Sequence, residues 1–452
     1  MTDCASPDVI VIGAGFAGLT TARELVRAGQ KVLLLEARDR VGGRVHSIEM
    51  AGLRLDIGGR YLGRGQTEAL ALAKEFDVTF YPPQVDGQML QSLNGRIVSI
   101  DDEFSGLISK EVGEEYERVA EQLEEMAQTL PAHESWNAPN ALDWDSMTAE
   151  AWVRAHTQHP ETVELLRGIC IGLVSAEMYE VSFLALLWYI RTSDGMYNAV
   201  DFENGLLKHL VKGSMHQLSM RLAESLADQL KLNSPVFRIE QDEQGVRVLS
   251  DSGTYTASHV IVAISPMLAG RITYAPALSP MRDTLMQKFA HGRLASILVA
   301  YERPFWCERG LSGMVSGDAD SWATNVLHVT PPGQPHGVLS CFVEPSKIVQ
   351  FAAFTDDERK ALILRDLVRY FGDEAATPIA YAEVNWTTET YTRGGYGWSL
   401  PPGALTMFGH TLRKPEGRVH WAGTETAEMF AGYIEGAIRS GKRAAHEILE
   451  KS

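Results

Sequence analysis

The stretch DVIVIGAGFAGLTTARELVRAGQKVLLLE, residues 8–36, decides the fold. Asp8–Ile12 and Lys31–Leu35 predict two buried parallel strands, because both are short, continuous apolar runs. Between them, a glycine-rich turn leads into a helix that ends near Arg27. A strand, a helix and a second strand in this order predict the start of a dinucleotide-binding sheet.

The turn carries the pattern Gly13-x-Gly15-x-x-Gly18, and Glu36 ends the second strand. The pattern alone is weak, but its place between a strand and a helix makes it specific. Its glycines permit a close approach of the backbone to a pyrophosphate, and the helix N-terminus offers free N–H groups to that anion. We expect Glu36 to accept hydrogen bonds from the adenosine ribose. The alternative is a turn without a ligand, which the full context disfavours.

The residues after Glu36 favour FAD over a nicotinamide dinucleotide. A flavin dinucleotide is bound along its whole length, and arginine supplies rigid, bidentate donors for its phosphates. Such residues follow closely: Arg38, Arg40, Gly42, Gly43 and Arg44. Gly58 and Gly59 predict a further close approach of the backbone, beside the isoalloxazine ring. The alternative is that these glycines only form turns.

Length, net charge and cysteine positions disfavour several classes of function. A chain of 452 residues predicts two or three domains. A formal net charge of −17 disfavours a nucleic-acid partner. The four cysteines form no CxxC pair and lie beside no metal-spaced histidines, so we expect neither disulfides nor a metal site. The short polar N-terminus and the lack of a long apolar run predict a soluble, cytoplasmic protein without a membrane partner.

Four further segments give a coarse outline of the remaining chain. Glu103–Leu130 predicts an amphipathic helix with an acidic outer face. Glu180–Ile190 predicts a buried helix, and Tyr255–Ile264 predicts one strand. Gly432–Leu449 predicts the last helix of the chain.

Several motifs in one order resemble those of the flavin-containing amine oxidases, the group of monoamine and polyamine oxidases. They span nearly the whole chain: residues 36–44 (EARDRVGGR), Pro235-Val236, residues 301–306 (YERPFW), residues 394–396 (GGY), residues 401–403 (PPG), residues 420–427 (HWAGTETA) and residues 432–437 (GYIEGA). Several matches in order are more specific than any one of them.

This resemblance implies an α/β fold with two intermingled domains. A discontinuous Rossmann-like FAD-binding domain takes residues 1–80, 207–283 and 388–452. A mixed α+β substrate-binding domain takes residues 81–206 and 284–387. The resemblance also implies the FAD-binding residues, which are Gly13, Gly15, Gly18, Glu36, Arg38, Gly43, Arg44, Gly59, Arg60, Val236, Gly423, Glu425 and Ile434.

The resemblance implies that Tyr396 and Tyr433 form two aromatic walls before the flavin and orient the amine. We interpret these walls as acting on the amine mainly through their shape and polarity, because the reacting amine must be neutral. Trp386 corresponds to a residue that packs near the flavin. The alternative for all three is ordinary core packing.

Two positions depart from the family pattern. Members with covalent flavin carry a cysteine directly before the first wall tyrosine, where this chain has Gly395, so we expect non-covalent FAD. The family's lysine near flavin N5 corresponds to Ser296, and Lys288 is too far away in sequence to replace it. A cation there assists electron transfer to oxygen, so its absence leaves open a slow oxidase or another electron acceptor. A gap in the alignment is the alternative.

Leu207 stands where several relatives have a polar pocket residue, which favours an apolar amine. We expect FAD to take a hydride equivalent from the amine, and the imine to hydrolyse to a carbonyl compound and ammonia. O2, reduced to H2O2, is the expected acceptor. The alternatives are an amine dehydrogenase, another FAD oxidase or desaturase, a non-catalytic flavoprotein, and an amino-acid oxidase, which would need a basic residue in the pocket. A homodimer is one candidate assembly.

Overall fold

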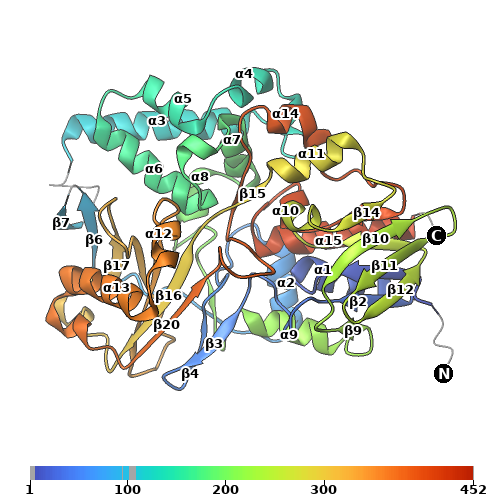
Figure 1. The fold of residues 1–452 in the computed structure, drawn as a ribbon. Coiled ribbons are helices and arrows are strands. Elements are labelled where there is room, and N and C mark those ends of the chain that lie inside the picture. Colours follow the sequence, from blue (N-terminus) through green and yellow to red (C-terminus); the bar gives the residue numbers. More distant parts are fainter. Residues whose placement is uncertain (1–5, 94, 101–107, 451–452) are drawn as a thin grey trace.

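Three layers surround the glycine-rich turn in the computed structural model, which describes residues 6–93, 95–100 and 108–450. The central layer is a parallel sheet of order β22-β13-β1-β2-β9, and Figure 1 shows it at the right. Its strands are β1 (Val9–Ile12), β2 (Val32–Leu35), β9 (Leu230–Lys231), β13 (His259–Val262) and β22 (Val419–Trp421). Helices cover one face: α1 (Phe16–Arg27), α2 (Thr67–Glu75), α9 (His216–Glu224) and α15 (Ile434–Leu449).

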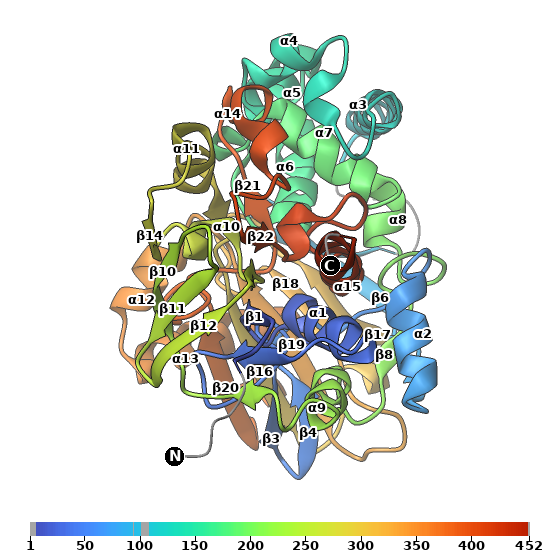
Figure 2. The same ribbon diagram turned by 90° about the vertical axis from the view of Figure 1, so that its right-hand side faces the viewer.

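A four-stranded sheet covers the other face of the parallel sheet, as Figure 2 shows from the side. Its strands are β10 (Val236–Gln241), β11 (Val246–Ser250), β12 (Gly253–Ala257) and β14 (Thr273–Ala275). Val9 and Val11 of β1 pack towards the helices, whereas Ile10 and Ile12 pack towards this second sheet. A strand buried on both faces must be apolar throughout, which explains the continuous apolar run at the start of the chain.

A seven-stranded sheet of order β20-β16-β19-β18-β17-β6-β7 forms the other half of the molecule. Its strands are β6 (Gln88–Leu93), β7 (Arg96–Ile100), β16 (Ala295–Tyr301), β17 (Leu311–Ser316), β18 (Asn325–His328), β19 (Gly337–Val343) and β20 (Ala380–Asn385). Helices α12 (Ile348–Ala353) and α13 (Asp356–Phe371) cover one face. The other face packs on the ribbon of β3 (Ser47–Met50) and β4 (Leu53–Asp56), so it turns towards the half that contains the glycine-rich turn.

A helical layer lies above both sheets in Figure 1. It contains α3 (Lys110–Gln128), α4 (Ala141–Asp145), α5 (Ala149–His156), α6 (Pro160–Val174), α7 (Phe183–Thr192), α8 (Met196–Val200), α11 (Pro280–Lys288) and α14 (Ala404–Phe408). The short helix α10 (Pro266–Ala269) packs on α11. Two small ribbons complete the fold, β5 (Phe80–Tyr81) with β8 (Leu210–Val211) and β15 (Ala290–His291) with β21 (Trp398–Ser399).

The predicted α/β fold class is confirmed, with one error of detail. The predicted single strand Tyr255–Ile264 is two strands, β12 and β13, which belong to different sheets. The chain bends between them, where the N–H groups of Ser258 and His259 both donate to the Asp8 carbonyl (3.0 and 3.3 Å). An apolar run does not reveal such a change of sheet. Of the predicted acidic helix Glu103–Leu130, Lys110–Gln128 forms α3, and residues 103–107 lie outside the described residues.

Candidate active site

The three glycines of the turn have different surroundings. Gly13 has a φ of +97°, and an added Cβ would lie 2.6 Å from Cγ2 of Ile264. A Cβ on Gly18 would lie 1.8 Å from the Gly13 carbonyl oxygen, so this glycine lets α1 pack on β1. A Cβ on Gly15, the N-cap of α1, would meet nothing within 4 Å. The open space at a helix N-terminus without acidic residues in its first turn suits an anionic group.

Glu36 lies buried at the end of β2. Its Oε2 accepts a hydrogen bond from the Ala14 N–H (2.7 Å), and its Oε1 accepts one from the Arg38 N–H (3.0 Å). Val236 is close by, because the Ser234 N–H, two residues earlier, donates to the Glu36 carbonyl (2.7 Å). The carboxylate is therefore fixed at the edge where an adenosine group is expected.

Arg38 and Arg44 have different partners. The Arg38 guanidinium is hydrogen-bonded to Glu389 and Thr392. Arg44 Nη2 lies 2.8 Å from Oε1 of the fully buried Glu425, and its Nη1 donates to the Tyr396 carbonyl (3.2 Å). Arg44 thus connects the nucleotide-binding half to the loop of the first wall tyrosine.

Of the remaining predicted cofactor residues, Gly43 lies near the glycine turn, Gly59 near Arg44, and Gly423 and Ile434 at α15. A Cβ on Gly43 would lie 3.5 Å from the Gly15 Cα. A Cβ on Gly59 would touch Val45, the neighbour of Arg44, at 3.4 Å. Gly423 follows β22 with a φ of +119°, and its N–H donates to Ser440 of α15 (3.1 Å). Ile434 is the first residue of α15.

Tyr396 and Tyr433 lie close enough for their phenols to interact electrostatically. Tyr396 Oη donates to the Gly172 carbonyl of α6, and Ser193 Oγ donates to Tyr433 Oη (3.3 Å). The Tyr433 ring also packs against Tyr189 of α7, with 6.0 Å between ring centroids. Burial raises the pKa of both wall tyrosines, so both phenols are neutral at physiological pH.

Ser296 lies on β16 with 1% exposure, and no described residue is a hydrogen-bond partner of its Oγ. It pairs with Phe342 of β19, and the Phe342 ring lies 6.1 Å from the Tyr396 ring. Cross-strand partners point to the same face of a sheet, so Ser296 faces the Tyr396 side. Lys288 is exposed at the end of α11 and does not reach this position.

The other two predicted pocket residues are less informative. Trp386 is buried after β20, and its carbonyl accepts a hydrogen bond from the Gly394 N–H in the loop of Tyr396 (2.7 Å). Leu207 is half-buried, between the core residue Leu206 and Lys208, a wall residue of a cavity.

Sequence reasoning did not assign Tyr189 and His291 to this region, and it included Thr424 only as part of the motif at residues 420–427, without a role. The Tyr189 hydroxyl in an otherwise apolar helix was a usable signal, since a buried phenol needs a polar partner. Thr424 Oγ1 accepts from the Gly432 N–H and donates to the Tyr433 carbonyl, 2.8 Å each, so it fixes the second wall. Burial, together with the charge of Arg44, lowers the pKa of His291 to about 4, which keeps this imidazole neutral.

Buried polar atoms without a protein partner mark the region as a ligand site. Among the described residues, no hydrogen bond reaches Arg60 Nη1 and Nη2, Ser296 Oγ or Trp398 Nε1. Native proteins rarely leave such groups unsatisfied. The residues present therefore fit a ligand that supplies hydrogen-bond acceptors, as FAD does.

The sequence model of the flavin-containing amine oxidoreductases matches residues 16–449. The chain belongs to this family. The predicted family and enzyme class are thus confirmed, and membership implies a flavin cofactor.

Three relatives illustrate the range of this amine oxidoreductase family. An L-amino acid dehydrogenase of Synechocystis sp. is 35% identical over 99% of this chain and 96% of its own length. The structure of a cyclohexylamine oxidase from Brevibacterium oxydans IH-35A is 32% identical, with a TM-score of 0.93 and 99% of both chains covered. A putrescine oxidase structure with bound putrescine is 31% identical, with the same TM-score and coverage.

Neither a membrane-spanning helix nor a metal-binding cluster occurs among the described residues of this amine oxidoreductase. No helix within residues 6–93, 95–100 and 108–450 is long and apolar enough to cross a bilayer. In the same described part of the chain, no group of three or more His, Cys, Asp or Glu side chains could hold a metal ion.

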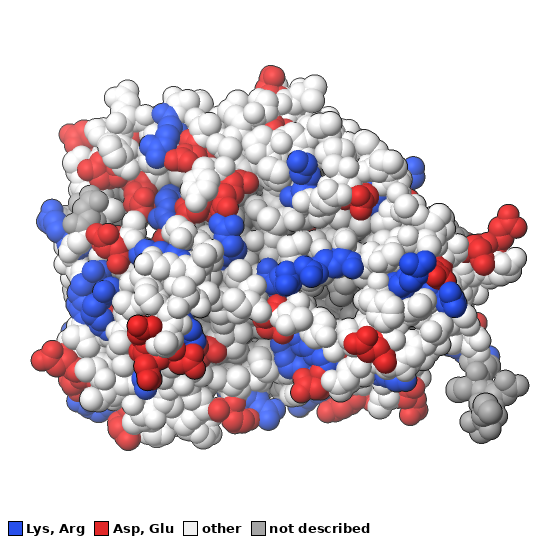
Figure 3. Space-filling model, in the orientation of Figure 1, with Lys and Arg blue, Asp and Glu red and all other residues white. Residues whose placement is uncertain are grey.

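Figure 3 shows Lys and Arg side chains beside a hollow near the middle of one face, so the net negative charge is unevenly spread.

Proposed function

We propose that this amine oxidoreductase uses non-covalent FAD to oxidise a small amine to an imine, with O2 as the electron acceptor. When bound, FAD would supply the acceptor for a hydride equivalent from the α-carbon of the amine, and O2 would take up these electrons as H2O2. Water then hydrolyses the imine to a carbonyl compound and ammonia. The chain's own residues bind, orient and shield the reactants.

The observation that carries this proposal is the pair Tyr396 and Tyr433, whose phenols lie close to each other. Arg44 connects Tyr396 to the predicted cofactor residues, and Thr424 fixes Tyr433. We infer that these two buried, neutral phenol rings wall a weakly polar slot, in which an uncharged amine is favoured over an ammonium because burial disfavours the charged form. Such a slot orients the α-carbon of the amine, which is the main contribution a protein makes to hydride transfer.

The FAD assignment rests on the open space at Gly15, on Glu36 at the end of β2 and on the Arg44–Glu425 pair. Non-covalent binding is supported by the positions of the described cysteines. Cys170 is buried in the helical layer and Cys341 in the seven-stranded sheet. Cys307 is exposed beyond Trp306, and Gly395 occupies the position next to Tyr396.

Ser296 favours a second candidate function, an amine dehydrogenase. A buried neutral hydroxyl supplies no charge to stabilise the negative charge that develops when oxygen is reduced. Electrons would then pass to another acceptor, such as a quinone.

The test is aerobic turnover of the purified yellow protein with a panel of small amines, following oxygen, H2O2 and ammonia together. An oxidase consumes oxygen and produces H2O2 and ammonia in equal amounts. Turnover only with an added quinone or dye supports the dehydrogenase. If no amine gives ammonia with any acceptor, amine oxidation is the wrong reaction.

A further inference from the structure

Tyr189 of α7 is a buried phenol that contacts the surroundings of both wall tyrosines. The residue is 1% exposed, and its ring packs against the Tyr433 ring with 6.0 Å between centroids and an angle of 44°. It also packs against the Trp398 ring, with 5.7 Å between centroids and an angle of 55°. Trp398 begins β21, two residues after Tyr396. One ring therefore contacts Tyr433 directly and the segment that follows Tyr396.

The Tyr189 hydroxyl lies against the second wall. Gly432 has a φ of +97°, and an added Cβ there would lie 2.6 Å from Tyr189 Oη, so this glycine makes room for the hydroxyl. Burial raises the pKa of Tyr433, and side-chain hydrogen bonds with Ser193 and Tyr189 partly oppose this rise. Hydrogen bonds that favour the ionised form of a phenol are those its oxygen accepts. Tyr433 Oη is therefore the acceptor and Tyr189 the donor.

Ser193, the C-cap of α7, provides the second contact with the same phenol. The residue is buried, and its Oγ donates to the Tyr189 carbonyl (2.8 Å) and lies 3.3 Å from Tyr433 Oη. Side chains four residues apart lie on one face of a helix. Two hydroxyls on one face of α7 thus converge on the oxygen of Tyr433.

The backbone of Tyr433 is fixed by other contacts. The Phe430 N–H donates to the Thr192 carbonyl at the end of α7 (2.6 Å), and the Tyr433 N–H donates to the Phe430 carbonyl (3.0 Å). Thr424 Oγ1 donates to the Tyr433 carbonyl. With this backbone held, the freedom that remains to Tyr433 is rotation of its side chain, and the two α7 hydroxyls restrain that rotation.

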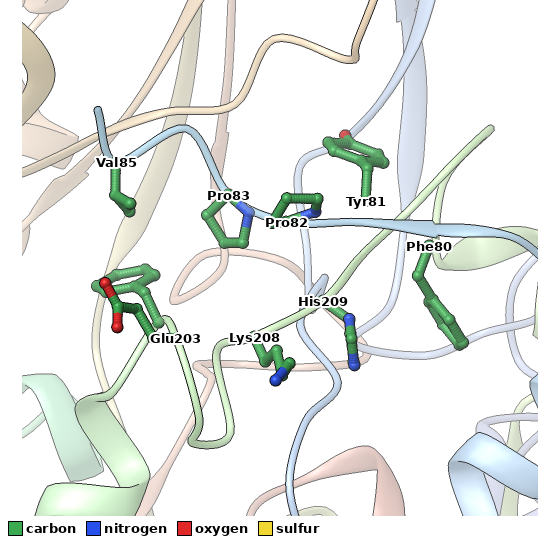
Figure 4. A pocket seen from close by; sticks show the side chains of 9 residues that line it. Phe80, Tyr81, Pro82, Pro83, Val85, Glu203, Lys208 and His209 are labelled. Atoms are coloured by element: carbon green, nitrogen blue, oxygen red, sulfur yellow. The ribbon is translucent and has the colours of Figure 1, made fainter. Parts of the chain in front are cut away.

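A cavity of about 470 Å³ lies elsewhere, between residues 80–85 and residues 202–209 (Figure 4). Its lining residues do not include Tyr189, Tyr396 or Tyr433. The spacing of the two walls is therefore determined by packed side chains and not by this opening.

We propose that Tyr189 and Ser193 are positioning residues, whose hydroxyls hold the Tyr433 ring in one orientation relative to Tyr396 and so align the amine for hydride transfer. This inference rests on the proposed function. Both residues act through Tyr433, without a contact of their own to the amine. The rate of a transfer between held reactants depends steeply on their alignment, so a small rotation of one wall reduces it.

The test removes each hydroxyl in turn, with Tyr189→Phe and Ser193→Ala. Each flavin-loaded variant is mixed anaerobically with the small amine that reduces the wild-type flavin fastest, with benzylamine and cyclohexylamine tried first. Stopped-flow absorbance separates the limiting rate of flavin reduction from the dissociation constant of the amine. We expect the limiting rate to fall about 3- to 10-fold, the loss of one hydrogen bond, and the dissociation constant to stay within about twofold of wild type.

Crystal structures of the flavin-loaded wild type and Tyr189→Phe give a readout without turnover. We expect the Tyr433 ring of the variant to turn, or to occupy more than one orientation. The backbone of residues 430–433 and the Tyr396 ring should stay in place, because other contacts hold them.

Tyr370→Phe is the matched control, since it removes a buried phenol hydroxyl, which donates to the Ala323 carbonyl (3.1 Å), under α13. It should leave the limiting rate and the Tyr433 ring unchanged. A Tyr433 ring that keeps its orientation in Tyr189→Phe, or a limiting rate equal to that of the control, overturns the proposal. A change in amine affinity alone, or loss of flavin from both α7 variants, overturns it too. These outcomes leave the proposed function intact, whereas a wild-type flavin that no small amine reduces ends both.

Discussion

Gly15 and Gly18 lie three residues apart, yet an added methyl group should affect them through different mechanisms. In Gly18→Ala the methyl group would overlap the Gly13 carbonyl, so α1 must move off β1. We expect a loss of about 2–3 kcal/mol in the free energy of unfolding. In Gly15→Ala the methyl group enters open space, so the fold should be kept while FAD affinity falls at least about tenfold, because the backbone can no longer approach a pyrophosphate.

Urea denaturation and FAD titration of the two variants check this pair of expectations. Circular dichroism shows whether each variant is folded before the titration. If Gly15→Ala bound FAD as tightly as the wild-type protein does, the pyrophosphate would have to bind elsewhere.

Ser296 is the second position where a single side chain decides chemistry. Ser296→Lys would place a cation on the face of β16 that is turned towards Tyr396. We expect reoxidation of the reduced enzyme by O2 to accelerate at least about tenfold, since a positive charge stabilises the developing superoxide. Stopped-flow mixing with oxygenated buffer measures the rate, and Ser296→Met, similar in length but uncharged, is the control. Equal rates in both variants would show that charge at this position does not limit the oxygen step.

At the scale of elements, the end of β4 and the start of α9 are joined by Asp56. Its pKa is raised from 3.8 to about 7, first by burial, so between pH 4 and 7 the folded protein binds more protons than the unfolded chain. The free energy of unfolding should therefore fall as pH rises through this window. Asp56→Asn should remove that part of the slope, while the exposed Asp228→Asn should not. Parallel pH profiles for wild type and Asp56→Asn would contradict the assignment.

The elements also show what sequence could predict. The βαβ start and α7 were both predicted from apolar runs, and in the structure nearly all residues of these runs are buried. The division of Tyr255–Ile264 between two sheets could not be predicted, because a local pattern contains no information on which strand will be the neighbour. The domain boundaries at residues 80, 207, 283 and 388 remain a prediction.

The same limit applies to the site. The motifs predicted which glycines, acids and tyrosines belong to the site, because the chemistry of each motif requires those residue types at that spacing. The environment of Arg60 could not be predicted, because its lack of a partner depends on contacts among segments distant in sequence. The proximity of Tyr189 to Tyr433 likewise depends on how the helical layer packs on α15.

At the scale of the whole molecule, the two halves meet where the flavin is expected, so the cofactor should stabilise the entire fold. Acid precipitation should release all flavin into the supernatant as FAD, because no described cysteine lies beside Tyr396. Chromatography of the supernatant against FAD and FMN standards measures this. Flavin that remains in the washed pellet would show a covalent bond, and FMN would rule out the adenosine role of Glu36.

The central claim is that amines reduce a flavin held between the glycine turn and the two wall tyrosines. The most direct measurement is the visible spectrum of the purified protein during anaerobic addition of small amines, including cyclic, arylalkyl and amino-acid ones. The account predicts that at least one of them bleaches the flavin absorbance, that air restores it, and that Tyr396→Ala with Tyr433→Ala slows the bleaching. A flavin spectrum that none of these amines changes would contradict it.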